Sequence, residues 1–474
     1  MSCFDIRMTK TILKEGDEGV TLIIKEAKKR DASSFDKRRP VHVVYGGANL
    51  FKHDTTQKLG RIALETLDRY SPNFSEFAAA FHLGDFASLP RDHDAVIALD
   101  ARLNEDPERV KRDFYAAWFA WTVYRKTREK LVREAVEDFR IDFEDGYGHR
   151  SDDEEDSDAA TAAVELAKAI RTGTAPAFIG IRVKSFEPET YNRGLRTLEV
   201  FLNTLLEYNN NELPPNFAVS LPKVSSDKET KALAAQLKKF ERNAGLAKRS
   251  IEIEFLVETS EAIIDKRGRF ALGRIAKSCK GRCRSAHFGA YDFTSGLGIS
   301  SRFQDIRHPA CDLARQLMLL TLRPHGIGLS DSVTTEIPVA PHKGVDLAEQ
   351  QLKDNRNAIH SAWLHHFENI MRSYSNGFYQ SWDLHPAQLP ARFAAVYSFF
   401  LDSLPSQAGR LKGFIAKSAK TNLTGNVFDD AASVRGIVTF FVQGLNCGAI
   451  SDEELTAAVG ISADDLRQIN FKSL

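Results

Sequence analysis

The feature of the sequence that most constrains its fold is a series of eight short apolar runs. Most of them are bounded by Gly, Pro or Asn, and most are separated by stretches with the apolar spacing of helices. The runs cover residues 41–47, 139–145, 177–183, 217–224, 251–259, 283–289, 326–333 and 377–384. Eight strands alternating with helices predict an α/β fold, the closed parallel (β/α)8 TIM barrel. An open doubly wound sheet stays possible, because counting strands does not prove closure.

Three segments fall outside this alternation. We expect an N-terminal segment over residues 1–35, a barrel over 36–404 with a helical insertion at 72–137, and a helical C-terminal extension over 405–474. The extension is predicted to begin with a polar connection and to continue in short helices. Its apolar run VRGIVTFFV requires a covering surface, on its own barrel or on a neighbouring subunit, and we expect a homo-oligomer.

The best-marked helix follows the second predicted strand. The acidic run SDDEED (residues 151–156) suits a solvated helix N-terminus, where the macrodipole favours carboxylates, and Gly173 suits the C-terminal end. The acids are contiguous and lack the spaced ligands of a calcium loop. We therefore predict a helix between these two points.

Charge and cysteine content limit the classes of partner. Lys plus Arg and Asp plus Glu each number 64, so no basic field exists to attract nucleic acid or an anionic membrane. The longest apolar runs are far shorter than the ~20 residues of a membrane span. Five scattered cysteines do not resemble a disulfide framework and suit a reducing compartment. We expect a cytoplasmic protein that binds a small molecule.

Charged residues gather at the carboxyl ends of the predicted strands, where (β/α) barrels carry their chemistry. Strand interiors are otherwise expected to be apolar, so burying these charges without a purpose would cost several kcal/mol each. In the second run, RIDFEDGYG, the alternation of an extended chain places two acids on one face. The strand-end residues are Asp142, Glu144, Asp145, Arg182, Lys223, Glu258, Asp292, Asp331 and His385.

Carboxylates that converge with an arginine, without a Cys/His cluster, indicate a hard divalent cation with oxygen ligands. Mg²⁺ is the first expectation, and Mn²⁺ is possible. A nearby guanidinium binds an oxyanion, so both cations would stabilise the charge of an enolate. The acidic face of the second strand is then expected to look at a metal and its waters.

At these positions the sequence resembles the Mg²⁺-dependent 2-keto acid aldolase and citrate lyase β-subunit superfamily. The strings LVETSEAI and HFGAYDFTSGLG are similar to its paired signature. FEDGYG, IRV, LPKV and GFYQSWDLHPAQL match further strands in the same order. The resemblance covers roughly residues 41–400 and implies a pyruvate/phosphoenolpyruvate-type TIM barrel.

The resemblance implies roles for individual residues. The metal ligands fall on Glu258 and Asp292, and the substrate-polarising arginine falls on Arg182. Asp142 and Glu144 match acids that hold metal-bound water. Asp145 stands where sugar-acid aldolases usually have a histidine for proton transfer and citrate lyase-like members have an aspartate, so the chain sides with the second branch.

Other readings of the same residues stay open. Glu258 and Asp292 can be a structural pair or, for Asp292, a helix cap. Arg182 can form a plain buried salt bridge with Asp142 or Glu144. Lys223 is expected to be a charge partner of these acids, and His385 is expected to cap the last strand.

The helix start at Gly289 and Ala290 is predicted to offer N–H groups to a substrate carboxylate. The leading hypothesis is a carbon–carbon lyase that acts on a 2-keto acid or an acyl thioester through a metal-stabilised enolate. The alternatives are a phosphoenolpyruvate-linked phosphotransferase and a non-catalytic ligand-binding barrel.

Overall fold

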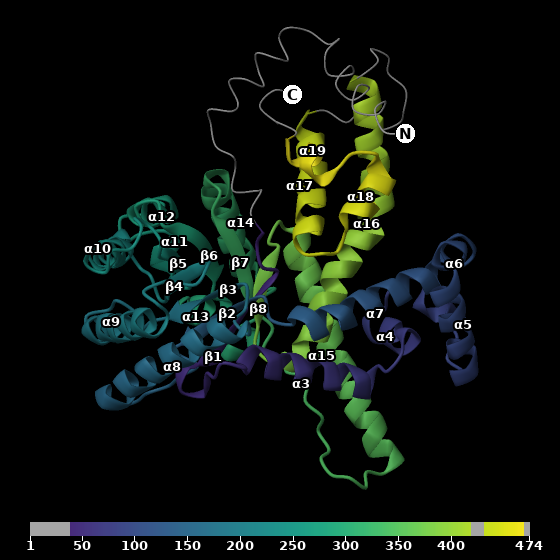
Figure 1. The fold of residues 1–474 in the computed structure, drawn as a ribbon, viewed down its shortest axis with the longest axis horizontal. Helices are drawn as coiled ribbons and strands as arrows, with labels where there is room; N and C mark the ends of the chain where they lie inside the picture. The colour runs from purple at the N-terminus through teal and green to yellow at the C-terminus, as the bar shows by residue number, and fades with distance from the viewer. Residues whose placement is uncertain (1–37, 419–430, 469–474) are drawn as a thin grey trace. The chain divides into compact units, whose positions relative to one another are not determined.

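The computed structural model describes residues 38–418 and 431–468 (Figure 1). The predicted N-terminal segment 1–35 lies outside these residues. The chain divides into two compact units, of which one is Pro40–Tyr397 and the other includes the residues from Ser398 onward.

The first unit is built on a closed barrel of eight parallel strands in sequence order. β8 pairs with β1, with Val43 opposite Trp382, so the sheet has no free edge and the open-sheet alternative is excluded. Each strand falls within one of the eight predicted runs or within one residue of it. The strands are β1 (His42–Gly47), β2 (Asp138–Asp142), β3 (Phe178–Arg182), β4 (Phe217–Leu221), β5 (Glu252–Val257), β6 (Cys283–Phe288), β7 (Gly328–Val333) and β8 (Gln380–Asp383).

Helices follow the strands and cover the outside of the barrel (Figure 1). The predicted helix after β2 is confirmed: Ser151 and Glu154 form a capping box at its start, and Gly173 ends it at a φ of 68°. The helices of the barrel are α8 (Asp152–Thr172), α9 (Tyr191–Tyr208), α10 (Asp227–Asn243), α11 (Ser260–Ile263), α12 (Leu272–Ser278), α13 (Ala290–Gly296), α14 (Pro309–Leu322) and α15 (Glu349–Ser375).

Short 3-10 turns complete several of the connections. They are η1 (Ala48–Leu50), η2 (Phe86–Ser88), η3 (Ser301–Phe303), η4 (Arg323–His325) and η5 (Pro386–Gln388).

Five helices lie between β1 and β2: α3 (Thr55–Tyr70), α4 (Phe74–Phe81), α5 (His93–Glu105), α6 (Pro107–Asp113) and α7 (Tyr115–Glu134). The last four fall in the region of the predicted insertion. Aromatic side chains join this group to α15, since the ring of Phe81 lies 5.6 Å from those of Trp363 and Phe367. Figure 1 shows α4 to α7 beside α3 and α15, on one side of the barrel.

The second unit consists, in its described part, of helices. α16 runs from Leu389, in the first unit, to Ser418 and contains Pro405. The first part of the polar connection predicted after residue 404 is therefore helical, and the rest of it, from residue 419, lies outside the described residues. α17 (Ala431–Asn446), α18 (Asp452–Val459) and α19 (Ala463–Gln468) follow. The ring of Phe440 packs 5.2 Å from that of Phe400, which gives part of the apolar run VRGIVTFFV a surface within this unit.

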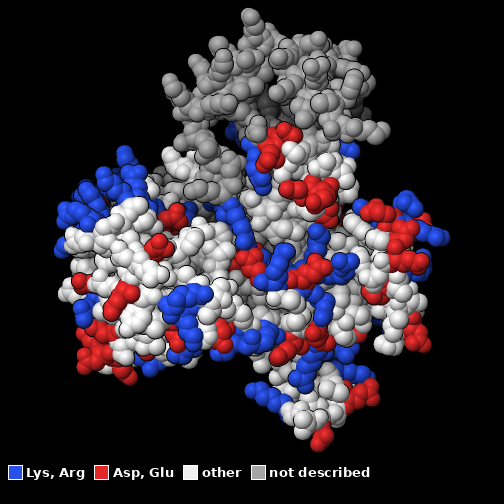
Figure 2. Space-filling view, in the orientation of Figure 1, with Lys and Arg blue, Asp and Glu red and all other residues white. Residues whose placement is uncertain are grey.

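Acidic and basic side chains are interspersed over the visible face (Figure 2). This distribution agrees with the equal numbers of the two signs of charge. None of the helices among the described residues is long and apolar enough to cross a membrane.

Candidate functional site

A buried ion pair joins the carboxyl ends of β2 and β3. Asp142 and Arg182 are opposite in the strand register, and the Nε and Nη2 atoms of Arg182 each donate to Asp142 at 2.7 Å. The two carboxylate oxygens of Asp142 also accept from the backbone N–H groups of Glu144 (3.0 Å) and Gly146 (2.7 Å). Asp142 therefore faces a guanidinium and two amides, and its expected role in holding metal-bound water stays a prediction.

Arg182 reaches a second layer of acids through its remaining nitrogen. Nη1 lies 3.1 Å from Glu144 and 3.7 Å from Asp145, whose side chain is 56% exposed. Burial would lower the pKa of Arg182, but the charge of Asp142, its hydrogen bonds and the charge of Glu144 raise it above the ordinary value. Arg182 thus stays a fixed cation directly beneath a solvent-facing carboxylate.

Lys223, after β4, is the expected charge partner of these acids. Its Nζ contacts Glu144 and lies 3.0 Å from Asp145. Burial raises the pKa of Glu144. The pKa of Asp145 is lowered despite burial, because it hydrogen-bonds with Glu144 and faces Arg182 and Lys223. Asp145 is therefore an ionised, weak base at neutral pH.

The backbone of Lys223 makes a separate contact, with Glu258. Its φ of 51° lies in the left-handed region, which is uncommon for a residue with a side chain. In this conformation its N–H donates to the carboxylate of Glu258 while its side chain reaches Glu144 and Asp145. One strained residue thus connects the two groups of acids.

Glu258 follows β5 and is only 3% exposed. Burial raises the pKa of its carboxyl to about 8, and the negative charge of Asp292 contributes in the same direction. Asp292 lies in the first turn of α13 and is exposed. A Cβ on Gly289 would lie 2.6 Å from Oε2 of Glu258, so the glycine leaves the space that this carboxyl occupies.

The donor set at the mouth of the barrel fits a hard cation. Glu258 and Asp292 interact through like charges, and a divalent cation bound by both carboxylates would relieve that repulsion. Over residues 38–418 and 431–468, no cluster of three or more His, Cys, Asp or Glu side chains could hold a metal ion. A cation here would rest on two carboxylates, with water and substrate oxygens completing its shell, as Mg²⁺ permits.

The two amides expected to face a substrate carboxylate both have protein acceptors. The N–H of Gly289 donates to the carbonyl oxygen of Val257 at 3.1 Å, and that of Ala290 donates to Oγ of Ser332 at 3.0 Å. Neither group is directed at open space, so Gly289 matters here for the room it gives Glu258.

Aromatic side chains that the sequence analysis did not select cover Arg182. The guanidinium lies 4.8 Å from the ring centre of Tyr45 on β1 and 5.5 Å from that of Trp382 on β8. The two rings lie 4.2 Å apart. Both residues are partly exposed, so they form an aromatic wall beside the arginine. The sequence signal that could have identified them is the alternation of side chains along a strand, which places Tyr45 and Trp382 on the inward face of β1 and β8.

The barrel interior is polar, and the expectation of apolar strand interiors is wrong. Nε of Arg140 on β2 donates to Glu254 on β5 at 2.8 Å, and the same arginine pairs with Asp138. Side chains from β2 and β5 can meet only across the inside of the barrel. Glu254 also accepts from Ser220 at 2.9 Å and from Ser285 at 2.7 Å. The cost of burying these charges is offset by the pairing.

Two of the predicted strand-end residues serve other parts of the fold. Asp331 pairs with Arg315 at 3.1 Å and accepts from Ser373 at 2.6 Å, which ties β7 to α14 and α15. His385 accepts from the N–H of Ala387 at 3.1 Å at the start of η5, so it caps the chain after the last strand.

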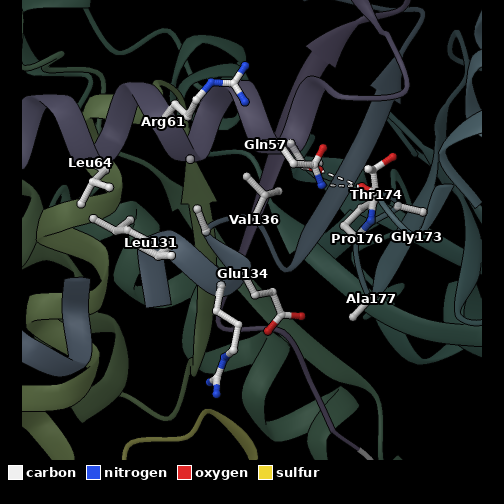
Figure 3. Close-up of a pocket in the computed structure, with 16 residues that line it drawn as sticks. Gln57, Arg61, Leu64, Leu131, Glu134, Val136, Gly173, Thr174, Pro176 and Ala177 are labelled. Carbon is white, nitrogen blue, oxygen red and sulfur yellow. Dashed lines mark hydrogen bonds between the residues drawn. The ribbon is translucent and has the colours of Figure 1, made fainter. Parts of the chain in front are cut away.

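A separate hollow of about 620 Å³ lies near the opposite end of the strands (Figure 3). It is lined by α3, the end of α7 just before β2, and the segment before β3, where Gln57 donates to the carbonyl oxygen of Thr174 at 2.9 Å. None of the predicted site residues lines it. Barrel chemistry belongs to the carboxyl ends of the strands, so we place the candidate site there and not in this hollow.

A family model described as "Domain of unknown function (DUF6986)" matches residues 26–474. The chain belongs to this family. The matched residues of this DUF6986 chain include the whole barrel and the C-terminal helices described above. No curated protein matches the sequence.

Solved structures similar to this DUF6986 chain include two citrate lyases and a malate synthase. A citrate lyase from Burkholderia xenovorans LB400 is 18% identical, with a TM-score of 0.48 over 68% of this chain and 88% of that chain. A malate synthase from Haloferax volcanii is 14% identical, with a TM-score of 0.41 over 68% and 83%. The citrate lyase β subunit from M. tuberculosis, complexed with oxaloacetate and magnesium, is 18% identical, with a TM-score of 0.35 over 58% and 93%.

Proposed function

We propose that the protein is a Mg²⁺-dependent carbon–carbon lyase or aldolase that acts on a 2-keto acid or an acyl thioester. The observation that carries the proposal is a set of charged residues at the carboxyl ends of the strands: the buried carboxyl of Glu258 after β5, Asp292 in the first turn of α13, and Arg182, which Asp142 holds in place. Ionising this buried carboxyl without a neighbouring cation is costly, and burial, followed by the charge of Asp292, raises its pKa to about 8. Titratable groups with such shifts are concentrated at functional sites.

Two groups of residues have separate roles: one would hold a cation, and the other would bind an oxyanion of the substrate. Glu258 and Asp292 would hold Mg²⁺. When bound, the ion supplies Lewis-acid stabilisation of negative charge on substrate oxygens. Arg182 supplies a second, permanent positive charge, and Asp142 fixes its orientation through two hydrogen bonds of 2.7 Å. A preorganised cation of this kind needs no reorganisation when charge develops.

On cleavage, the electron pair of the broken carbon–carbon bond would stay on the carbon next to the carbonyl, which gives an enolate. The other fragment would leave as an aldehyde or ketone after its hydroxyl loses a proton, or as carbon dioxide in a decarboxylation. Arg182 offsets the charge on the enolate oxygen. The wall formed by Tyr45 and Trp382 shields the guanidinium, which strengthens this interaction by excluding water. Asp145 and Lys223, at the solvent side, would hold a polar or charged substituent of the substrate.

Oxaloacetate decarboxylation tests the proposal, because it forms the same enolate from a simple 2-keto acid. Turnover should require Mg²⁺ or Mn²⁺, cease with EDTA, and fall at least ~100-fold in Glu258→Gln, in the range typical of lost transition-state stabilisation. Asp346→Asn, which changes an exposed carboxylate between β7 and α15, should behave as wild type.

Other results would redirect the proposal. Turnover unaffected by both EDTA and Glu258→Gln would contradict it. Metal binding without turnover across a panel of 2-keto acids and acyl thioesters would favour a ligand-binding barrel. A phosphorylated product detected by phosphorus NMR with phosphoenolpyruvate would favour a phosphotransferase.

A further inference from the structure

A chain of hydrogen bonds runs from the aromatic wall into the interior of the barrel. Oη of Tyr45 lies 3.3 Å from Nδ1 of His287, and Nε2 of His287 lies 3.0 Å from Oγ of Ser285. Ser285 in turn donates to Glu254 at 2.7 Å. Tyr45 is on β1 and His287 is on β6, so this chain crosses the barrel interior.

Glu254, the last member of this series of hydrogen bonds, sets the direction of every bond in the series. Glu254 is buried, and although burial raises its pKa, the charges of Arg140 and Arg284 hold the pKa well below the ordinary value. An ionised carboxylate only accepts hydrogen bonds. The Ser285 hydroxyl is therefore a donor to Glu254, and it accepts from the N–H of His287.

The tautomer of His287 follows from this order. When the imidazole is neutral it carries one proton, and the Ser285 hydroxyl, which already donates to Glu254, places that proton on Nε2. Nδ1 is then a bare acceptor, and the hydroxyl of Tyr45 donates to it. The protons point one way along the chain, from Tyr45 through His287 and Ser285 to Glu254.

The residues at both ends of this series of hydrogen bonds have surroundings that allow a proton to move. Burial raises the pKa of Tyr45, so its hydroxyl is protonated at rest. Its ring lies against Arg182, which places the residue beside the position proposed for the enolate. At the other side, Nε2 of His287 lies 3.6 Å from Glu254, whose negative charge would stabilise an imidazolium. Arg140, Arg182, Arg284 and Asp138 are the other charged groups around these residues.

We infer that Tyr45 and His287 form the acid–base pair of the site, with Ser285 and Glu254 as positioning residues. This inference rests on the proposed function and adds the group that moves the proton. A C–H proton next to the carbonyl of the substrate passes to Oη of Tyr45 while the proton of Tyr45 passes to Nδ1 of His287. The electron pair left on the substrate forms the enolate, and the reverse transfer returns the proton to the enolate carbon.

Two reactions of simple keto acids separate this inference from the proposed function. Oxaloacetate decarboxylation makes the enolate by losing carbon dioxide and needs no base. Exchange of the methyl protons of pyruvate with deuterium from the solvent needs a group that removes a C–H proton. The first reaction reports on the metal and Arg182, and the second also reports on Tyr45 and His287.

The experiment measures both rates in wild type and in Tyr45→Phe, His287→Gln and Tyr124→Phe. The ratio of exchange to decarboxylation should fall ~100-fold or more in the first two variants, which is the lower range for a lost general base. Tyr124→Phe is the matched control, because its hydroxyl donates to the carbonyl oxygen of Pro72 within the inserted helices. It should keep the wild-type ratio.

A wild-type ratio in Tyr45→Phe and His287→Gln would overturn the inference and leave the proposed function standing. Absence of both reactions in wild type would overturn both. Nitrogen-15 NMR of histidine-labelled protein gives a readout without turnover, with His287 assigned by its loss in His287→Gln. The expected form is the neutral Nε2–H tautomer, and an Nδ1–H tautomer would overturn the proton order on which the inference depends.

Discussion

Replacing Asp142 by asparagine should both destabilise the barrel and release Arg182. Each carboxylate oxygen of Asp142 accepts two bonds: Oδ1 from Arg182 Nε and the N–H of Glu144, and Oδ2 from Arg182 Nη2 and the N–H of Gly146. An amide NH₂ at either position faces two donors. One charge-assisted and one backbone hydrogen bond are lost, whichever way the amide turns.

The expected cost is about 3 kcal/mol of unfolding free energy. The lost charge-assisted bond contributes about 1.5–3 kcal/mol and the backbone bond about 1 kcal/mol. Breaking a buried pair by removing one partner typically costs 3–5 kcal/mol, and both side chains here are at most 1% exposed. Glu144, 3.1 Å from Nη1, keeps part of the charge compensated and places the estimate at the low end.

Urea unfolding of wild type and Asp142→Asn measures this difference. Asp68→Asn is the matched control, because Asp68 pairs with Arg128 on the surface and its loss should cost under about 1 kcal/mol. The decarboxylation rate of Asp142→Asn should also fall, since Arg182 loses its fixed orientation. A destabilisation of Asp142→Asn no larger than that of the control would refute the reasoning.

Three further predictions concern stability and pH. Glu258, with a folded pKa raised to about 8 against an ordinary 4.5, binds more protons in the folded than in the unfolded chain, so the metal-free protein should lose stability as pH rises from about 4.5 to 8. Glu258→Gln should flatten that dependence in urea titrations at several pH values. Gly289→Ala should cost about 1–3 kcal/mol and weaken Mg²⁺ binding measured by calorimetry, because its Cβ would lie 2.6 Å from Oε2 of Glu258. Ser151→Ala should lower the unfolding free energy by about 1 kcal/mol through loss of the capping box, and an unchanged value would show that α8 does not need it.

The barrel itself could be predicted because its signal is local. A buried parallel strand such as β4 is an almost continuous apolar run, and Asn216 and Pro222 bound it. The capping box at Ser151 and the glycine at position 173 also act over a few residues. Once eight strand–helix units follow one another, few alternatives remain for the order of the strands and the closure of the sheet.

The polar interior could not be predicted in the same way. Arg140 and Glu254 each alternate with apolar residues in their runs, and their partnership spans 114 residues of sequence. Alternation alone places Arg140 on the same face as Asp142, but it does not say what lies opposite. The same limit explains why Tyr45 and His287 were not recognised as neighbours.

Two other expectations from the sequence differ from the structure. The segment after residue 404 was read as a polar connection, yet α16 continues through Pro405 to Ser418. The N–H groups of Gly289 and Ala290 were expected to face a ligand, but the strand pairing of β5 with β6 and the hydroxyl of Ser332 use them.

The central claim is that Glu258 and Asp292 hold one divalent cation beside Arg182. A crystal structure of the protein soaked with Mn²⁺ and pyruvate tests it most directly, since anomalous scattering locates the ion without assumptions. We expect a single ion bonded to both carboxylates, with the keto acid between the ion and the guanidinium. An ion bound elsewhere, or the two carboxylates directed away from each other in the soaked crystal, would contradict it.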